Sequence, residues 1–336
     1  MKTLYFTFDY ELYLGNVTGS VENCLIIPTE HLCRVFDKHN VKATFFVDCA
    51  YLYMLDSLKE QFPKLDEEFN IIVKNLKWLS SNGHDIQMHF HPQWIYSKYD
   101  GITWQLDFTH YKLSDVEPEY LQSSFSKGRM LLEKIVGKEI CAYRAGGFCL
   151  SDYLDFPTLF MKNHIKIDSS VVPGKKLDDG CVKYNYEKVP TKSVWHFSSN
   201  LTKEDPNGCF VEVPISLHKN GKIVYLKHKI NELFDKHNNT RMWGDGKSIF
   251  MKNSSQNKVK KILNRALWLF RANDIMCSID VYNSAYLTSM IKRGNSDSIV
   301  LVSHPKCLTP EGLNYLEAFL DKYSNQIVCK SISSIL

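Results

Sequence analysis

The sequence has no large excess of charge, no long apolar run and no low-complexity tract. Its 41 Lys and Arg residues against 37 Asp and Glu residues leave a formal net charge of +4, and the basic residues do not form a stripe of the kind that follows phosphates. We therefore expect no nucleic-acid partner. No stretch reaches the roughly 18 to 20 uninterrupted apolar residues of a membrane span, so we also expect no membrane-spanning segment.

Paired cysteine motifs are missing as well. The 10 cysteines form no CxxC pair and have no regular spacing, and several lie in apolar periodic segments where a free thiol packs as a small hydrophobe. The first apolar run, Leu4 to Phe8, ends at Asp9 and is too short for the core of a signal peptide. These features predict a reducing, cytoplasmic location.

What the sequence does contain is an alternation of strand-like and helix-like segments. This order predicts an α/β fold, either a barrel or an open parallel sheet, which periodicity alone does not separate. We predict a single domain over residues 1–336, with insertions at about 93–120 and 218–256 that interrupt the alternation. The predicted strands are Leu4 to Phe8, Val41 to Val47, Asp85 to Phe90, Ile140 to Tyr143, His164 to Asp168, Cys209 to Val213, Met276 to Val281 and Ile299 to Ser303. The predicted helices are one capped by Thr29, Glu68 to Ser81, Leu121 to Val136, Val259 to Ala272 and about Thr309 to Lys322.

Several polar side chains stand where predicted strands end. In parallel α/β folds the carboxyl edge of the strands carries the active site, so these residues are the first candidates for chemistry. They are Asp9, Glu11, His89, His91, Arg144 and His304.

His89 and His91 are the candidate metal ligands with the clearest geometry. At positions i and i+2 of an extended segment, both imidazoles point to the same face. With a carboxylate from Asp9 or Glu11 they make a facial site of two histidines and one acid, which suits Zn²⁺, Co²⁺, Ni²⁺ or Mn²⁺. The alternative is that the two histidines are only polar residues at the rim of the fold.

At this point the sequence resembles the polysaccharide deacetylases of carbohydrate esterase family 4. The resemblance covers about residues 3 to 306 and rests on five motifs in the family's order. These are Thr7-Phe8-Asp9-Tyr10-Glu11, Ala43-Thr44-Phe45-Phe46-Val47, Gly83-His84-Asp85-Ile86-Gln87-Met88-His89-Phe90-His91-Pro92, Tyr143-Arg144-Ala145-Gly146-Gly147-Phe148 and Leu301-Val302-Ser303-His304-Pro305.

The resemblance implies a distorted (β/α)7-type barrel with loop insertions, and a divalent metal, with Zn²⁺ preferred, held by Glu11, His89 and His91. It implies Asp9 as the general base. The chain departs from the family pattern at Tyr10, where many relatives have the metal carboxylate, and at Gln93, where they have the second histidine. Glu11 and His91 are therefore substitute ligands.

The remaining roles follow from the same comparison and from simple chemistry. Arg144 would orient Asp9 and hold its pKa down, or would only form an ion pair at the rim. His304 would protonate the leaving group. The turn Gly146-Gly147-Phe148 could bring a backbone amide to the oxyanion, or could be an ordinary tight turn.

Asp168 could orient His304 or bind a sugar hydroxyl, with helix capping as the alternative. Glu212 also ends a predicted strand. A second group of residues could form a stacking wall for a sugar ring or could pack in the core. This group is Trp94, Tyr96, Trp104 and Tyr111.

Together these features predict a metal-dependent hydrolase that removes an N-acyl group, less readily an O-acyl group, from an amino sugar or a surface-polysaccharide precursor. The alternatives are a C–N hydrolase that acts on a non-sugar amide or imide, and a carbohydrate-binding homologue that has lost its ion. A glycosidase is a weaker alternative, because that chemistry needs a close pair of carboxylates. The sequence does not determine the oligomeric state.

Overall fold

The computed structural model describes residues 1–219, 222–248, 274–293 and 297–336. The predicted helix Val259 to Ala272 lies outside these residues, as does the end of the predicted insertion, 249–256.

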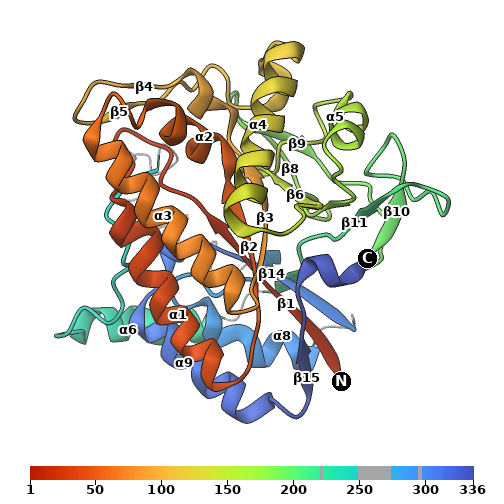
Figure 1. The fold of residues 1–336 in the computed structure, drawn as a ribbon. Helices are drawn as coiled ribbons and strands as arrows, with labels where there is room; N and C mark the ends of the chain where they lie inside the picture. Colours follow the sequence, from red (N-terminus) through yellow and green to blue (C-terminus); the bar gives the residue numbers. More distant parts are fainter. Residues whose placement is uncertain (220–221, 249–273, 294–296) are drawn as a thin grey trace.

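A curled sheet of nine strands forms the centre of the molecule (Figure 1). Its order is β10-β11-β7-β6-β3-β2-β1-β14, and β15 pairs with the first residues of β1. Neighbouring strands run parallel except β10 and β11. The strands are β1 (Lys2–Tyr10), β2 (Thr44–Asp48), β3 (Asp85–Phe90), β6 (Ala142–Ala145), β7 (Ile167–Asp168), β10 (Trp195–Phe197), β11 (Phe210–Glu212), β14 (Ser298–Ser303) and β15 (Ile327–Cys329).

The sheet forms a half-barrel. Between β11 and β14 the ladder is replaced by single backbone hydrogen bonds, including Ser216 N to Val300 O at 3.1 Å and Val302 N to Cys277 O at 2.9 Å. The predicted α/β class and the distorted (β/α) barrel are therefore confirmed.

Helices cover the outer face of the sheet (Figure 1). Because side chains alternate along a strand, Phe6 and Phe8 of β1 both point outward, and their rings lie 5.2 and 6.1 Å from that of Phe36. The same alternation turns Asp9 to the opposite face. The helices are α1 (Ile27–Lys38), α2 (Cys49–Leu58), α3 (Pro63–Ser81), α4 (Pro118–Val136), α5 (Phe156–Lys162), α6 (Lys222–Phe234), α8 (Leu287–Arg293) and α9 (Pro310–Tyr323).

Most predicted elements are confirmed with small shifts of their ends. The prediction that Thr29 caps a helix is wrong, because the chain is already helical through the π-helical turn Glu22–Ile26 and Pro28 occupies the first turn of α1. The sequence analysis missed α2, which Asp48 caps. The strand predicted at Met276 to Val281 is largely wrong, since the regular pairing there covers β13 (Asp274–Met276).

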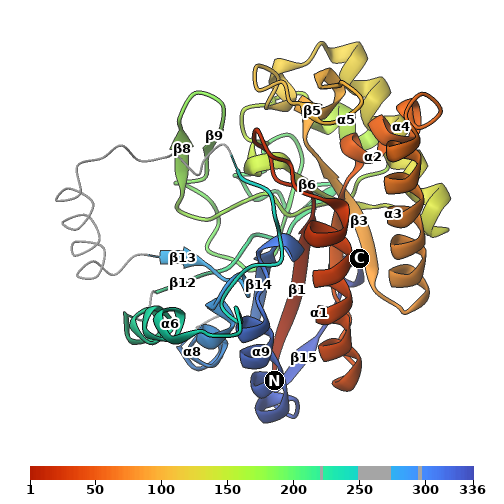
Figure 2. The ribbon, with the colours of Figure 1, turned by 90° about the vertical axis from the view of Figure 1, so that its left-hand side faces the viewer.

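The predicted insertions contain regular structure. The first holds the short hairpin of β4 (Lys98–Tyr99) and β5 (Trp104–Gln105). The second begins with β12 (Leu217–Lys219), which pairs with β13, and continues into α6. A further hairpin, β8 (Lys176–Asp178) and β9 (Lys183–Asn185), projects on the same side as β12 and β13 (Figure 2). The single-domain organisation stays a prediction.

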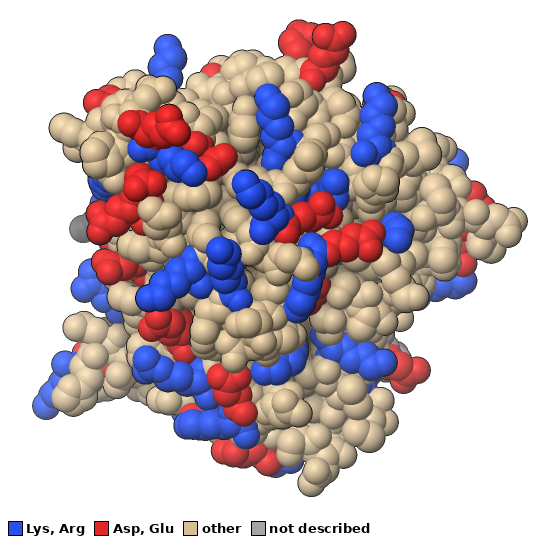
Figure 3. Space-filling model, in the orientation of Figure 1, with Lys and Arg blue, Asp and Glu red and all other residues tan. Residues whose placement is uncertain are grey.

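Two surface properties bear on possible partners. On the face in Figure 3, acidic and basic side chains are interspersed over the surface. Among the described residues, every helix is too short or too polar to cross a bilayer.

Two acids, Asp168 and Glu212, are buried side by side in neighbouring strands. They are register partners of β7 and β11, and both are fully buried. Burial raises the pKa of Glu212 well above its ordinary value, and the Asp168 carboxylate adds to the rise. Glu212 Oε2 faces no donor among the described residues, so a proton on this oxygen would supply a hydrogen bond to Asp168.

We predict that Glu212→Gln makes stability less dependent on pH. A raised carboxyl pKa contributes stability that is complete below the unfolded value of about 4.3 and is lost as pH rises through the folded pKa. As pH rises through this range, the free energy of unfolding in urea should fall more steeply for wild type than for the variant, by up to about 1.4 kcal/mol per pH unit. Glu139→Gln, at an exposed ion pair, is the control. Parallel pH profiles for wild type and Glu212→Gln would show that Glu212 carries no raised pKa.

Candidate active site

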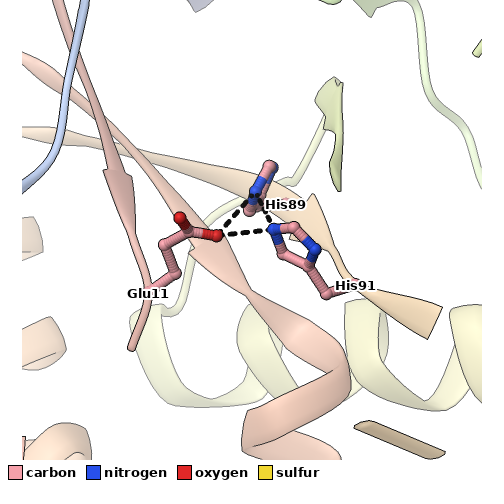
Figure 4. Close-up of side chains that lie close together, drawn as sticks. All are labelled: Glu11, His89 and His91. Atoms are coloured by element: carbon pink, nitrogen blue, oxygen red, sulfur yellow. Dashed lines mark hydrogen bonds and ion pairs between the residues drawn. The ribbon is translucent and has the colours of Figure 1, made fainter. Parts of the chain in front are cut away.

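Six side chains that the sequence analysis placed at strand ends approach one another at the carboxyl edge of the half-barrel. Three of them, Glu11, His89 and His91, form a compact cluster (Figure 4). Glu11 Oε2 lies 2.5 Å from His91 Nε2 and 3.2 Å from His89 Nε2, and the two Nε2 atoms are 2.9 Å apart. All three side chains are buried.

The backbone explains why these side chains converge. His91 follows β3 with φ −109° and ψ 101°, so the extended conformation continues past the strand and His89 and His91 point to one face. On the parallel strand β1 the same alternation puts Asp9 and Glu11 on one face. Tyr10 points the other way, where its hydroxyl donates to Asn75 Oδ1 at 3.1 Å.

The donor set fits a divalent metal. His89 Nδ1 donates to the carbonyl oxygen of Arg144 at 2.7 Å, which leaves the Nε2 lone pair directed at Glu11 and His91. Three acceptor atoms that face one another repel unless a cation or a proton lies between them. Burial lowers the pKa of His89, but the carboxylates of Asp9 and Glu11 outweigh burial and raise it to about 9, which indicates an environment that attracts positive charge.

Gln93 lies where it can orient His91 as a metal ligand. Its amide lies 3.4 Å from His91 Nδ1 and is fully buried, and Gln93 Oε1 has no partner among the described residues. With the amide turned by 180°, which keeps its shape, Oε1 would accept from Nδ1–H and leave His91 Nε2 free for an ion. In that orientation, the side chain at the position of the family's second histidine would orient His91.

Asp9 and Arg144 form a buried ion pair beside this cluster. Arg144 Nη1 donates to Asp9 Oδ1 at 2.7 Å, and the rest of the guanidinium donates to the carbonyl oxygen and hydroxyl of Ser169 at 2.9 and 3.0 Å. Burial alone would raise the pKa of Asp9, but Arg144, with His89 and His304, outweighs burial and lowers it. Asp9 is therefore ionised at neutral pH.

His304 faces both acids at the wall of the cavity. Its Nε2 lies 3.8 Å from Asp9 Oδ2 and 3.8 Å from Glu11 Oε1. Its Nδ1 donates to Asp280 Oδ2 at 3.0 Å, and its backbone N–H donates to Asp280 Oδ1 at 2.9 Å. Burial lowers the pKa of His304, but Asp280 and Asp9 outweigh burial and raise it, which favours the protonated imidazole.

Two residues that were predicted to belong to the site, Asp168 and Trp94, do not line the cavity. Asp168 does not orient His304: its carboxylate accepts from the Ser170 hydroxyl at 2.7 Å, away from the cavity lining, and Asp280 occupies the orienting position. Trp94 is fully buried and packs 5.3 Å from Trp104 and 4.6 Å from Tyr51. Trp94 and Trp104 therefore pack in the core, which was the alternative to a sugar-stacking role, because β4 and β5 fold over α2.

The turn after β6 is close-packed against the site. Gly146 is buried, and a Cβ there would lie 2.6 Å from His91 Nδ1. Gly147 has φ +57° and a Cβ would lie 2.9 Å from the Tyr111 ring, so glycine is required at both positions. Gly147 and Phe148 line the cavity.

The cavity itself has a volume of about 640 Å³, and of the six strand-end side chains all except the buried Arg144 line it. Aromatic side chains form much of its wall, among them Tyr13, Tyr111, Phe148, Tyr184 and Tyr282. Of the four aromatic residues that the sequence analysis suggested as a stacking wall, Tyr111 is the one that lines it among the described residues.

The roles of four residues that contact the site were not predicted from the sequence. Asp48 Oδ1 accepts from the backbone N–H of His91 at 3.3 Å, Asp280 holds His304, Gln93 faces His91, and Lys306 binds Glu11. Asp48 was detectable as an acid at the end of a predicted strand. Asp280 lies in the segment that was wrongly predicted as a strand, and Lys306 lies in a 3₁₀ turn too short to give a periodic signal.

We predict that Gln93→Leu weakens Zn²⁺ binding by about 10- to 100-fold, because His91 loses the acceptor that fixes its tautomer. Gln93→Glu keeps an acceptor of the same shape and should bind at least as tightly as wild type. Competition with a chromophoric chelator measures both. Equal affinity in wild type and the leucine variant would show that Gln93 does not orient His91.

Comparisons with known proteins bear on the first half of the chain and on the fold. Residues 1–154 match the family model of polysaccharide deacetylase. The structure assigned as a polysaccharide deacetylase from Mycobacterium smegmatis is 16% identical, with 99% of this chain and 89% of that chain covered and a TM-score of 0.50. At that identity the likeness shows the fold alone. A search of curated protein sequences gave no significant match.

Two further solved structures are more distant in shape. The family 4 acetyl xylan esterase from Clostridium thermocellum, in complex with a cobalt ion, is 13% identical, with 99% and 90% of the two chains covered and a TM-score of 0.38. The Bc1960 peptidoglycan N-acetylglucosamine deacetylase is 12% identical, with 99% and 87% covered and a TM-score of 0.41. Over residues 1–154, which hold the first four of the five motifs, the chain matches the polysaccharide deacetylase family model.

Proposed function

We propose that the protein is a metal-dependent deacetylase that hydrolyses an N-acyl group on an amino sugar. One observation carries the proposal: an ionised carboxylate, Asp9, and an imidazole that favours its protonated form, His304, face each other beside the cluster of Glu11, His89 and His91. This arrangement supports the assignment of a base, an acid and a set of metal ligands to one cavity.

The cation would be held by Glu11 Oε2, His89 Nε2 and His91 Nε2, a donor set that suits Zn²⁺ first, with Co²⁺, Ni²⁺ or Mn²⁺ as alternatives. When bound, such an ion polarises the acyl carbonyl and lowers the pKa of water. The other tasks fall to the protein's own side chains.

Asp9 takes the proton of the attacking water. Because Arg144 occupies Oδ1 at 2.7 Å, Oδ2 is the oxygen that faces His304 and the cavity. The buried guanidinium fixes the carboxylate and keeps it ionised.

His304 gives a proton from Nε2 to the leaving nitrogen, and Asp280 holds Nδ1 so that Nε2 points at the cavity. An amide nitrogen leaves poorly unless it is protonated, which supports N-acyl over O-acyl substrates. The Gly146 to Phe148 turn is the candidate site for an amide that binds the oxyanion.

The substrate that the cavity supports best is an acylated sugar. The apolar faces of a pyranose pack on aromatic rings, and Tyr111, Phe148 and Tyr184 line the cavity beside the metal ligands. A sugar unit of a surface-polysaccharide precursor is the substrate class we infer.

We predict that Asp9→Asn lowers acetate release from N-acetylated amino sugars by about 10²- to 10⁴-fold, because it removes the base, while Zn²⁺ stays bound. Glu11→Gln should lose both activity and metal. The two variants thus separate proton transfer from metal binding, with metal content measured by mass spectrometry.

Three results would contradict the proposal. One is full activity of Asp9→Asn. Another is ring opening of small cyclic imides in place of acetate release, which favours a non-sugar amide substrate. The third is wild-type protein that takes up no divalent metal on titration, which favours a binding protein without catalysis.

We also predict that Asp280→Asn lowers kcat by about a hundredfold and leaves KM and metal content nearly unchanged, because His304 loses its charged orienting partner. Steady-state kinetics with N-acetylated amino sugars would measure both constants. A change confined to KM would instead assign Asp280 to substrate binding.

A further inference from the structure

Lys306 is a buried lysine that neither the family motifs nor the proposed mechanism uses. It lies in the 3₁₀ turn Pro305–Cys307, two residues after His304, and its residue is 6% exposed. Its Nζ donates to Glu11 Oε1 at 2.8 Å and to the carbonyl oxygen of Leu12 at 2.7 Å, and lies 4.9 Å from the centre of the Tyr13 ring. A lysine is almost never buried unless it is paired.

The turn that carries Lys306 is held from several sides. Its carbonyl oxygen accepts from Gly244 N at 3.0 Å and from the Tyr13 hydroxyl at 3.3 Å. A Cβ at Gly244 would lie 2.6 Å from that oxygen, so the backbone contact requires glycine. The carboxylate of Asp245, next in the chain, accepts from the backbone N–H and the hydroxyl of Ser20, each at 2.8 Å. The second insertion therefore fixes Lys306 against the segment that follows β1.

Because Lys306 binds Glu11, the two oxygens of the Glu11 carboxylate have different partners. Oε1 accepts from Lys306, whereas Oε2 is the oxygen that faces His89 and His91 at 3.2 and 2.5 Å. A carboxylate free on both sides can hold an ion with two oxygens. A carboxylate whose second oxygen is bound to an ammonium group offers only one oxygen to an ion.

Because of this division we propose that Lys306 is a positioning residue that keeps Glu11 a one-oxygen ligand and reduces the negative charge that this ligand offers to the metal. The inference rests on the proposed function, since it concerns the same ion. With only one oxygen from Glu11, a bound ion would have a position free for the substrate and would polarise the substrate more strongly, and it would bind to the protein less tightly.

A purely structural ion pair would have the opposite effect on the metal. If Lys306 only held Glu11 in place, its removal would let Glu11 move and would weaken metal binding. If its charge opposes the ion, removal strengthens binding, because two like charges near one carboxylate repel each other. The direction of the change in affinity separates the two cases.

The test compares Co²⁺ binding by wild type, Lys306→Met and Lys306→Gln. Methionine fills the space of the lysine without charge or donor, and glutamine keeps an N–H donor for Glu11 without charge. Lys112→Met, at an ion pair with Asp115, is the control. Thermal unfolding of the metal-free proteins checks that each variant folds.

We expect Co²⁺ to bind about tenfold more tightly to both Lys306 variants and with wild-type affinity to Lys112→Met. In Lys306→Met the visible absorption of Co²⁺ should also weaken, because Glu11 becomes a two-oxygen ligand and the coordination number rises. In Lys306→Gln the spectrum should stay closer to that of wild type. Should methionine prevent folding, the affinity of the glutamine variant carries the test.

Unchanged or weaker Co²⁺ binding by the Lys306 variants would overturn the inference while leaving the metal site in place. Wild-type protein that binds no Co²⁺ would instead remove the proposed function itself. The two failures are therefore distinguishable within one titration series.

Discussion

The site depends on the pairing of two buried carboxylates with two buried cations. Asp9 and Glu11 leave water on one face of β1, and an unpaired charge there would be prohibitively unfavourable. Arg144 from β6 compensates Asp9, and Lys306 from the turn after β14 compensates Glu11. These pairs connect the first strand to segments far away in the chain and hold both acids ionised. The same contacts therefore stabilise the fold and keep the two carboxylates in the form that the proposed chemistry needs.

The two pairs also give the acids different tasks. Arg144 is fully buried and stacks 4.2 Å above the Phe46 ring, so Asp9 keeps one oxygen fixed and the other facing His304. Lys306 similarly leaves Glu11 Oε2 for the histidines. In both cases a cation occupies one oxygen of a carboxylate and directs the other to the cavity. We propose that one of these oxygens serves proton transfer and the other serves metal binding.

Regular local patterns made the fold and the centre of the site predictable. Alternation along strands predicts that Asp9 and Glu11 share a face, as His89 and His91 do, and parallel pairing then brings the strand ends together. Thr29 was misplaced because a π-helical turn precedes α1, and turns of that kind have no simple sequence pattern. Trp94 was ambiguous because aromatic residues serve both cores and sugar sites.

Residues that act through a neighbour were much harder to find. Asp280 reaches His304 from an irregular segment in which Val281 has φ +54°. Lys306 has the sequence appearance of a surface lysine, and its burial follows from contacts with residues far away in the chain, such as Gly244. Gln93 looks like a lost ligand until the geometry places it beside His91. Such roles depend on tertiary contacts, which no single-sequence pattern records.

The most direct test of the account is a crystal structure of the Zn²⁺-loaded protein with diffraction data on both sides of the zinc absorption edge. We expect one strong anomalous peak about 2.0 to 2.2 Å from Glu11 Oε2, His89 Nε2 and His91 Nε2, with Arg144 still bound to Asp9. An anomalous peak at another cluster, such as Asp280, His304 and Cys307, with none at the three predicted ligands, would contradict it.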